Sequence, residues 1–378
     1  MTIVLPAPTP HAGILQIAPY VGGESTTSHP TRRIRLAANE SEYGAAPAAI
    51  AAFAEGRESL HRYPDGSALA LRQTLGEKFD LQPERILCGT GSGDLLLLVA
   101  RCYCGAGDAV IYTEHGFLMY PIATAATGAT VIRVPEQNLT AVVDRILAAV
   151  TERTKIVFLA NPNNPTGTYI TASELARLHA GLPSTVLLVL DEAYCEFVDA
   201  VDYESGLSLA RDHANILVCR TFSKLYGLAA LRLGWAYGSA ETIDYMNRIR
   251  GPFNVGSAAQ AAAIAALGER QFYDDVAKKI QIERKRVSQS LQGIGLSVAP
   301  SVANFILVNF AEVGRRNPKL TATAAHDWLR SQGILTRRVA AYGLPDDLRI
   351  TIGKPEDMNC LINEIKVFLT TGLSNGAA

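Results

Sequence analysis

The segment that decides the fold reads Arg220-Thr-Phe-Ser-Lys-Leu-Tyr-Gly-Leu-Ala-Ala-Leu-Arg232. An apolar run over residues 215–219 precedes it, and a second run from Arg232 to Tyr237 follows it. Hydroxyl groups, the amine of Lys224 and an arginine therefore fall in one short connection between two expected strands. Such a set suits a phosphate-bearing aldehyde, because the amine can form a Schiff base while the hydroxyls and the arginine bind the phosphate. Taken alone, the segment fits an ordinary surface loop equally well.

The bulk composition is that of a globular protein. The chain has 378 residues, which favours two domains, and it carries a formal net charge of −1, which argues against nucleic acid or an anionic membrane as partner. No apolar run is long enough to span a membrane, and residues 1–8 lack the pattern of a signal peptide. The six cysteines lie mostly in apolar runs, without ligands at zinc spacing. We therefore expect a cytoplasmic protein with free thiols and no metal.

Short apolar runs alternate with helical patterns between residues 85 and 240. Expected strands cover residues 85–88, 109–112, 130–134, 155–160, 186–190, 216–219 and 233–237; expected helices nearby cover 47–60, 68–79, 95–102, 139–151 and 172–180. Because the strands are continuous Val/Ile/Leu runs, they predict a mostly parallel sheet covered by helices on both faces, an α/β fold. In such folds ligands bind beyond the carboxyl ends of the strands.

The pattern changes after Phe253 and predicts a smaller α+β domain. Its expected helices cover residues 258–267, 272–292, 322–332 and 355–369, and its strands cover 304–309, 334–338 and 348–352. We expect an N-terminal arm and the start of the small domain over 1–45, a large domain over 46–255 and the small domain over 256–378. Residues 1–35 are expected to be extended, and 370–378 frayed.

Three segments at expected strand ends carry polar groups suited to a ligand. The glycine-rich turn 89–94 opens a helix and predicts an anion site, although it matches neither a dinucleotide nor a Walker motif. The turn 161–167, Asn-Pro-Asn-Asn-Pro-Thr-Gly, either serves only as a rigid turn or directs an amide at a ligand. Asp191 ends a buried strand and needs a partner, either the next helix or a cationic ring nitrogen.

The order of Asn164, Asp191, Lys224 and Arg232 resembles the fold-type I pyridoxal-phosphate aminotransferases, and in particular the histidinol-phosphate aminotransferase family. The resemblance extends from Tyr20 to Gly353. The motifs that narrow it to this family are Pro19-Tyr-x-x-Gly23, Asn39-Glu40, Arg62-Tyr-Pro-Asp65 and Leu348-Arg-Ile-Thr-Ile-Gly353.

The resemblance implies a role for each catalytic side chain. Lys224 would form the Schiff base with pyridoxal phosphate and shuttle the proton of the substrate α-carbon. Asp191 would pair with the pyridine nitrogen, Asn164 and Tyr194 would bind the ring hydroxyl oxygen, and Phe117 would stack on the ring.

The resemblance also implies which residues bind the cofactor phosphate and the substrate anion, and it implies a second subunit as partner. The cofactor phosphate would be held by Ser92, Gly93, Asp94, Thr221, Ser223 and Arg232. Tyr63 would reach the phosphate of the neighbouring subunit's cofactor, which implies a homodimer with shared active sites. Arg349 would clamp the carboxylate or phosphate of the substrate. Tyr20, Asn39 and Arg337 would line the same pocket.

The chain departs from the family pattern near the substrate. It has Gly-Ser-Gly-Asp at 91–94 where Gly-Ser-Asp-Glu is usual, Gly22-Gly23 where Pro-Gly is usual, and Ser41 after Asn39-Glu40. The implied reaction is transamination of L-histidinol phosphate with 2-oxoglutarate in histidine biosynthesis. An aromatic amino acid aminotransferase is the alternative, followed by a decarboxylase acting on a substrate such as threonine phosphate. A non-enzymatic regulator of this fold would need a DNA-binding segment, for which the sequence has no pattern.

Overall fold

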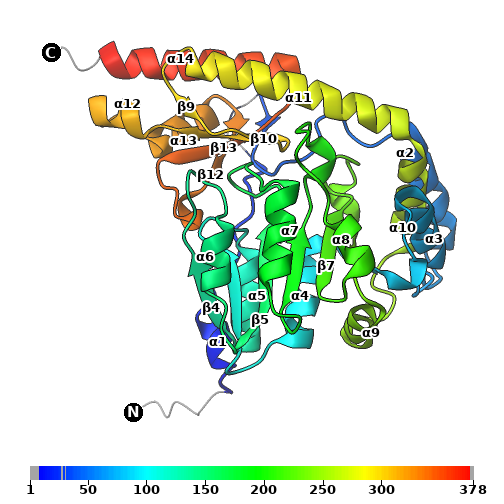
Figure 1. Cartoon of the computed structure of the whole chain (residues 1–378). Coiled ribbons are helices and arrows are strands. Elements are labelled where there is room, and N and C mark those ends of the chain that lie inside the picture. The colour runs from blue at the N-terminus through cyan, green and yellow to red at the C-terminus, as the bar shows by residue number, and fades with distance from the viewer. Residues whose placement is uncertain (1–7, 27–28, 30, 375–378) are drawn as a thin grey trace, which may run out of the picture.

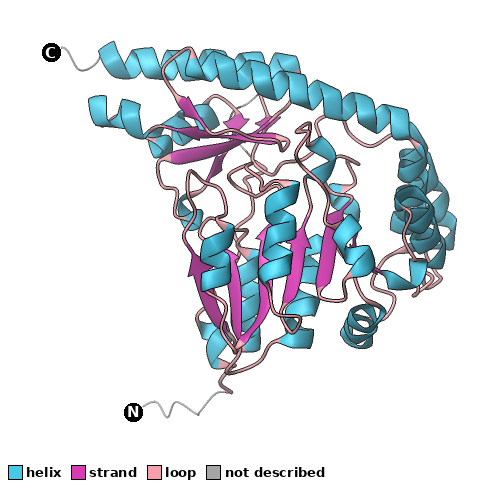
Figure 2. Cartoon of the chain, viewed as in Figure 1, coloured by secondary structure: helices cyan, strands magenta, loops and turns pink. Residues whose placement is uncertain are grey.

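The computed structural model describes residues 8–26, 29 and 31–374. A seven-stranded sheet lies at its centre, in the order β2-β8-β7-β6-β5-β3-β4 (Figures 1 and 2). The strands β3 to β7 run parallel, and β8 runs antiparallel to both of its neighbours. The prediction of a mostly parallel α/β sheet is confirmed. The strands are β2 (Ile86–Gly89), β3 (Ala109–Thr113), β4 (Thr130–Val134), β5 (Thr154–Ala160), β6 (Leu187–Asp191), β7 (Ile216–Thr221) and β8 (Gly234–Tyr237).

The continuous apolar runs arise because both faces of this sheet are covered. Along β6, Leu188 and Leu190 belong to one hydrophobic cluster, whereas Leu187 and Val189 belong to the cluster on the other face. Since successive strand residues point to opposite faces, a strand buried on both sides needs apolar residues at every position. Figure 1 shows α6, α7 and α8 on the near face and α4 and α5 behind. These helices are α4 (Ser92–Tyr103), α5 (Met119–Thr127), α6 (Val143–Ala148), α7 (Ala172–Gly181) and α8 (Leu207–Asp212).

A smaller antiparallel sheet, in the order β12-β13-β10-β9, lies under the long helices α11 (Arg270–Gln292) and α14 (Pro355–Ser374) (Figure 1). Its strands are β9 (Ser297–Val298), β10 (Phe305–Asn309), β12 (Arg337–Arg338) and β13 (Asp347–Thr351). A separate parallel pair joins β1 (Ile34–Arg35) to β11 (Ile334–Leu335). The remaining helices are α1 (Ala12–Leu15), α2 (Pro47–Glu55), α3 (Leu69–Phe79), α9 (Ala240–Ile249), α10 (Ser257–Gly268), α12 (Ala311–Arg316) and α13 (Ala322–Ser331).

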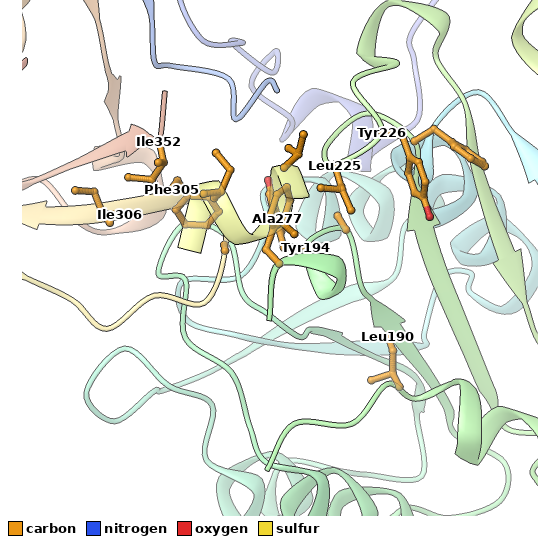
Figure 3. Close-up of a cluster of buried hydrophobic side chains, with 14 of the residues drawn as sticks. Leu190, Tyr194, Leu225, Tyr226, Ala277, Phe305, Ile306 and Ile352 are labelled. Atoms are coloured by element: carbon orange, nitrogen blue, oxygen red, sulfur yellow. The ribbon is translucent and has the colours of Figure 1, made fainter. Parts of the chain in front are cut away.

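The two layers share one core. Figure 3 shows Leu190 of the large sheet, Ala277 of α11 and Phe305 of the small sheet among the side chains of one buried cluster. Tyr194 lies in the same cluster, and its ring meets that of Phe305 edge-on at 5.1 Å. The carboxyl end of β6 is therefore packed against the small sheet. The domain boundaries at 45 and 255 stay a prediction.

Several boundaries expected from the sequence were wrong. The expected strand 334–338 is two short strands in different sheets, divided at the buried residue Thr336. The tail expected to fray from residue 370 is helical to Ser374, and the expected extended arm contains the short helix α1. The expected helix 47–60 ends at Glu55 and continues as a 3-10 turn. The bounds of α5, α8, α9 and α12 were not predicted; these are short helices of six to ten residues. No described helix is long and apolar enough to cross a bilayer.

Candidate active site

A cavity of about 520 Å³ opens where the large sheet meets the small one. It lies at the carboxyl ends of the central strands, since β6 ends at Asp191, β7 ends at Thr221, and Asn164 follows β5. Every site residue predicted from the sequence lines it except Tyr63. The predicted residues brought together are Tyr20, Asn39, Ser92, Gly93, Asp94, Phe117, Asn164, Asp191, Tyr194, Thr221, Ser223, Lys224, Arg232, Arg337 and Arg349.

Lys224 is positioned in the cavity as a weakly basic amine. Its Nζ donates a hydrogen bond of 3.0 Å to the Ala38 carbonyl and lies 5.7 Å from the centroid of the Tyr194 ring. Burial, followed by the positive charge of Arg349, lowers the pKa of Lys224 to about 7. A large fraction of this amine is therefore neutral near pH 7, as a nucleophile or a base requires.

Asp191 has two carboxylate oxygens in different surroundings. Oδ2 accepts a hydrogen bond of 3.1 Å from the Tyr120 hydroxyl, whereas Oδ1 is buried and has no partner in the described part of the chain. Burial raises the pKa of Asp191 to about 6. A buried carboxylate oxygen without a donor is unfavourable unless a ligand supplies one. The protonated ring nitrogen of a pyridine fits this requirement.

A site suited to an anion lies between the start of α4 and the end of β7. We call it the anion cradle, and it is formed by Gly91, Ser223 and Arg232. Gly91 has a φ of +97°, and a Cβ atom there would lie 2.6 Å from Arg232 Nη2. Arg232 Nη1 in turn donates to Ser223 Oγ at 3.2 Å and to the Ala229 carbonyl at 2.9 Å. No side chain caps the N-terminus of α4. Free helix amides, hydroxyls and a guanidinium in one place suit a phosphate.

Asp94 contributes to this cradle only indirectly. Its Oδ2 accepts a hydrogen bond of 3.1 Å from the Thr90 amide, so the carboxylate closes the glycine-rich turn. On the other side of the cradle, the Ser223 amide donates to Thr221 Oγ1 at 3.0 Å. These two bonds fix the turns that present the cradle, and a negatively charged Asp94 would not itself attract a phosphate.

A second cation, Arg349, lies buried at the small-sheet side of the cavity. Its Nη2 donates to the Ala37 carbonyl at 2.8 Å, and its Nη1 donates to Asn164 Oδ1. Its Nε has no partner among the described residues. The guanidinium therefore keeps hydrogen-bonding capacity for an anionic ligand.

Asn39 links the N-terminal segment to Tyr194. Its Nδ2 donates to the Tyr194 hydroxyl at 2.9 Å, and its backbone amide donates to Thr351 Oγ1 at 3.0 Å. Asn39 has a φ of +55°, a conformation that asparagine tolerates better than most residues. Burial raises the pKa of Tyr194 to about 12, so its hydroxyl stays protonated at neutral pH.

The N-terminal arm covers one side of the cavity. Arg337 donates to the Val21 and Gly22 carbonyls of the arm. The Tyr20 ring meets Phe117 edge-on, with the ring centroids 6.3 Å apart. In this conformation Arg337 holds the arm, a role that sequence reasoning did not anticipate.

Two tyrosines differ from the sequence prediction. Tyr63 was predicted to be a site residue but lies outside this cavity, whereas Tyr120 was not predicted but contacts a site residue. The Tyr63 side chain is 82% exposed and stacks on Phe253 at 4.6 Å. Tyr120 contacts Asp191 directly, yet no role was predicted for it. Its position three residues after Phe117, on the same face of a helical turn, was the available signal.

Comparisons with known proteins agree with this geometry. Residues 31–365 match the family model of aminotransferase class I and II. The histidinol-phosphate aminotransferase of Rhodospirillum centenum is 50% identical over 93% of this chain and 96% of its own length, and that of Paramagnetospirillum magneticum is 48% identical over 96% and 99%. Among solved structures, histidinol-phosphate aminotransferase from Sinorhizobium meliloti in complex with pyridoxal-5'-phosphate has 30% identity and a TM-score of 0.87, covering 97% of this chain and 99% of that one. This chain thus belongs to the class I and II aminotransferases and, among them, to the histidinol-phosphate aminotransferase family.

Proposed function

We propose that this chain transfers the amino group of L-histidinol phosphate to 2-oxoglutarate in histidine biosynthesis, giving imidazole acetol phosphate and glutamate. The observation that carries the proposal is that one cavity holds Lys224, the Arg232 anion cradle and a second guanidinium on Arg349. One anion site suits the cofactor phosphate, and the other suits the anionic group of the substrate. The names of relatives at about half identity over nearly the whole chain support the same reaction.

The residues fit pyridoxal phosphate as the cofactor. The unpartnered Asp191 Oδ1 suits the ring nitrogen, and the cradle around Gly91 has room for a phosphate only because no Cβ is present there. Phe117 would stack on the ring, and Asn164 and Tyr194 would bind its hydroxyl oxygen. The phosphate would lie against Ser92, Gly93, Thr221, Ser223 and Arg232, with Asp94 shaping the turn.

Pyridoxal phosphate, when bound, supplies an aldehyde for the substrate amine and a cationic ring that withdraws electrons from the substrate α-carbon. The protein supplies proton transfer and orientation. Lys224 Nζ, with its pKa lowered to about 7 by burial, would accept the proton from the substrate α-carbon and deliver it to the C4′ atom of the cofactor. Asp191 Oδ1 holds the proton at the ring nitrogen. The Arg349 guanidinium, through its free Nε and its terminal nitrogens, would orient the anionic group of the substrate.

Substrate choice would depend on the side chains around Arg349. Tyr20, Asn39 and Arg337 line the same cavity, and so do the apolar side chains of Leu97 and Met119. A cavity with both aromatic or apolar side chains and an arginine would also accept phenylalanine or tyrosine, with the arginine binding the carboxylate. The aromatic aminotransferase therefore remains the second candidate function.

A rate panel separates these reactions. We expect kcat/KM with L-histidinol phosphate and 2-oxoglutarate to exceed that with phenylalanine or tyrosine by at least about a hundredfold, because a phosphate brings more negative charge to the second anion site than a carboxylate does. Formation of glutamate should be measured for each donor. Threonine phosphate is the control for decarboxylation and should release no carbon dioxide. A preference for phenylalanine would overturn the assignment.

We also propose a homodimer, located in the cytoplasm. Large exposed apolar side chains occur on α2 (Ile50 and Phe53) and at the Tyr63–Phe253 stack, as expected of a surface that another copy covers. Tyr63, outside its own cavity, would then reach the cofactor phosphate of the partner subunit. The six cysteines are free thiols, which is compatible with a reducing compartment.

A further inference from the structure

Tyr120 is the one side chain that hydrogen-bonds Asp191 among the described residues. Its hydroxyl lies 3.1 Å from Asp191 Oδ2. Burial, and then the charge of Asp191, keep the pKa of Tyr120 well above its usual value. The hydroxyl therefore retains its proton and acts as the donor, and Oδ2 is the acceptor. This bond leaves the buried Oδ1 as the free oxygen of the carboxylate.

The Tyr120 ring has little freedom to move. It is 1% exposed and stacks on Phe158 of β5, with the ring centroids 4.9 Å apart and the planes 4° apart. Phe117 and Tyr112 meet it edge-on at 6.0 and 6.3 Å. Rings packed on three sides hold one rotamer, so the hydroxyl is directed at Asp191 before any ligand binds.

The bond also bears on the charge of Asp191. Burial alone would favour the neutral acid, and it raises the pKa of Asp191 to about 6, whereas the Tyr120 hydroxyl opposes this rise. An ionised carboxylate is required to keep a proton on a pyridine nitrogen. Removing the donor would raise the proton affinity of Asp191, so that the carboxylate competes with the ring nitrogen for the proton, and a phenylalanine at position 120 would still fill the core.

We propose that Tyr120 is a positioning residue that holds Asp191 ionised, with Oδ1 directed at the ring nitrogen of the cofactor. The inference rests on the proposed pairing of Asp191 with pyridoxal phosphate, but not on the identity of the amino donor. Tyr120 would contact neither the cofactor nor the substrate, and it would act only through the Asp191 carboxylate. The aromatic contact with Phe117 couples the same ring to the residue expected to stack on the cofactor.

The direct test follows the protonation of the cofactor in the holoenzyme. Isotope-labelled pyridoxal phosphate is bound to wild type, Tyr120→Phe and Tyr112→Phe, and the ring nitrogen is titrated by NMR without substrate. We expect the ring nitrogen of Tyr120→Phe to be protonated to a smaller fraction than in wild type at neutral pH, because the Asp191 carboxylate, without its donor, takes up part of the shared proton. Tyr112→Phe removes a hydroxyl from a neighbouring ring and should titrate as wild type does. An unchanged titration in Tyr120→Phe overturns the inference.

Asp191→Asn separates the inference from the assignment on which it rests. If Asp191→Asn shifts the titration and Tyr120→Phe does not, only the role of Tyr120 falls. If Asp191→Asn leaves the titration unchanged, the pairing itself is wrong and both proposals fall. In turnover, Tyr120→Phe should lower kcat about tenfold with KM within about twofold of wild type, and it should have no further effect in the Asp191→Asn background. Equal additional losses in both backgrounds would indicate a merely structural role and contradict the proposal.

Discussion

At the scale of single residues, the site depends on burying charged groups that water would otherwise stabilise. Lys224 loses basicity through burial beside Arg349, and Asp191 becomes less acidic through burial beside the sheet end. Both shifts move the groups toward the neutral range in which a catalyst exchanges protons. Burying these groups therefore lowers the stability of the cofactor-free protein.

Substituting Lys224 should reveal this loss of stability. An unfolded lysine keeps its proton up to about pH 10.5, whereas the folded one releases it near 7, so unfolding takes up a proton between these values. The contribution of Lys224 to stability is therefore most unfavourable below pH 7 and improves as the pH rises toward 10.5. We expect cofactor-free Lys224→Met to be more stable than wild type by about 2 kcal/mol at pH 6, with the difference shrinking at alkaline pH.

Urea unfolding of the two proteins across pH checks this expectation. Lys354→Met, a change at an exposed lysine, is the matched control and should not show the same pH dependence. The same Lys224 variant should have no measurable transaminase activity, because it lacks the amine that we propose forms the Schiff base. If Lys224→Met were less stable than wild type below pH 7, the assigned pKa shift would be contradicted.

At the scale of elements, strand ends and helix starts place the ligand-binding groups. The start of α4 directs amides into the cavity, and the turn after β7 presents Ser223, Lys224 and Arg232 within nine residues of one another. Gly91 allows the two segments to approach closely, since any side chain there would collide with the Arg232 guanidinium. The cradle therefore depends on a glycine that carries no chemistry of its own.

Gly91→Ala should weaken cofactor binding. The Cβ would occupy the space 2.6 Å from Arg232 Nη2, and alanine is strained at a φ of +97°. We expect the Kd for pyridoxal phosphate to rise at least about tenfold, equivalent to about 1.4 kcal/mol, in fluorescence titrations of the cofactor-free protein. Gly268→Ala, at the end of α10 where a Cβ would meet nothing within 4 Å, is the control and should bind normally. Equal affinity in the two variants would argue against the phosphate site.

At the scale of the whole molecule, the cavity lies between two layers that share a core. On the side of the large sheet, Asp191 ends β6 and Lys224 lies in the turn after β7, whereas Arg337 and Arg349 belong to strands of the small sheet. The arm is held to the small sheet by Arg337. A change in the relative position of these layers would move the substrate anion site with respect to Lys224.

The proposed dimer can be tested by mixing two defective variants. If Tyr63 acts in the partner's site, a heterodimer of Lys224→Ala and Tyr63→Ala contains one site in which both residues are present. Random reassociation should then restore roughly a quarter of the wild-type specific activity, because half of the dimers are mixed and each has one intact site of two. Each variant alone should be nearly inactive, and light scattering should give the mass of two chains. Activity that stays at the level of the separate variants would place Tyr63 outside the shared site.

The sequence by itself determined the α/β class, the mostly parallel sheet and the polar residues that follow the strands. It could do so because those signals are local: apolar runs buried on both faces, turns rich in glycine and proline, and polar residues directly after a strand. The length of α14 and the division of 334–338 between two sheets could not be read in this way, because packing against distant segments fixed both.

Tertiary structure alone decided which atoms meet. Tyr120 and Asp191 are 71 residues apart, Asn39 and Tyr194 are 155 apart, and Asn164 and Arg349 are 185 apart. No local propensity encodes such contacts, because they arise only when the sheet, the arm and the small domain close around one cavity. The sequence therefore named the lysine, the aspartate and the arginines of the site, and the fold decided how burial and these distant partners set their charge and direction.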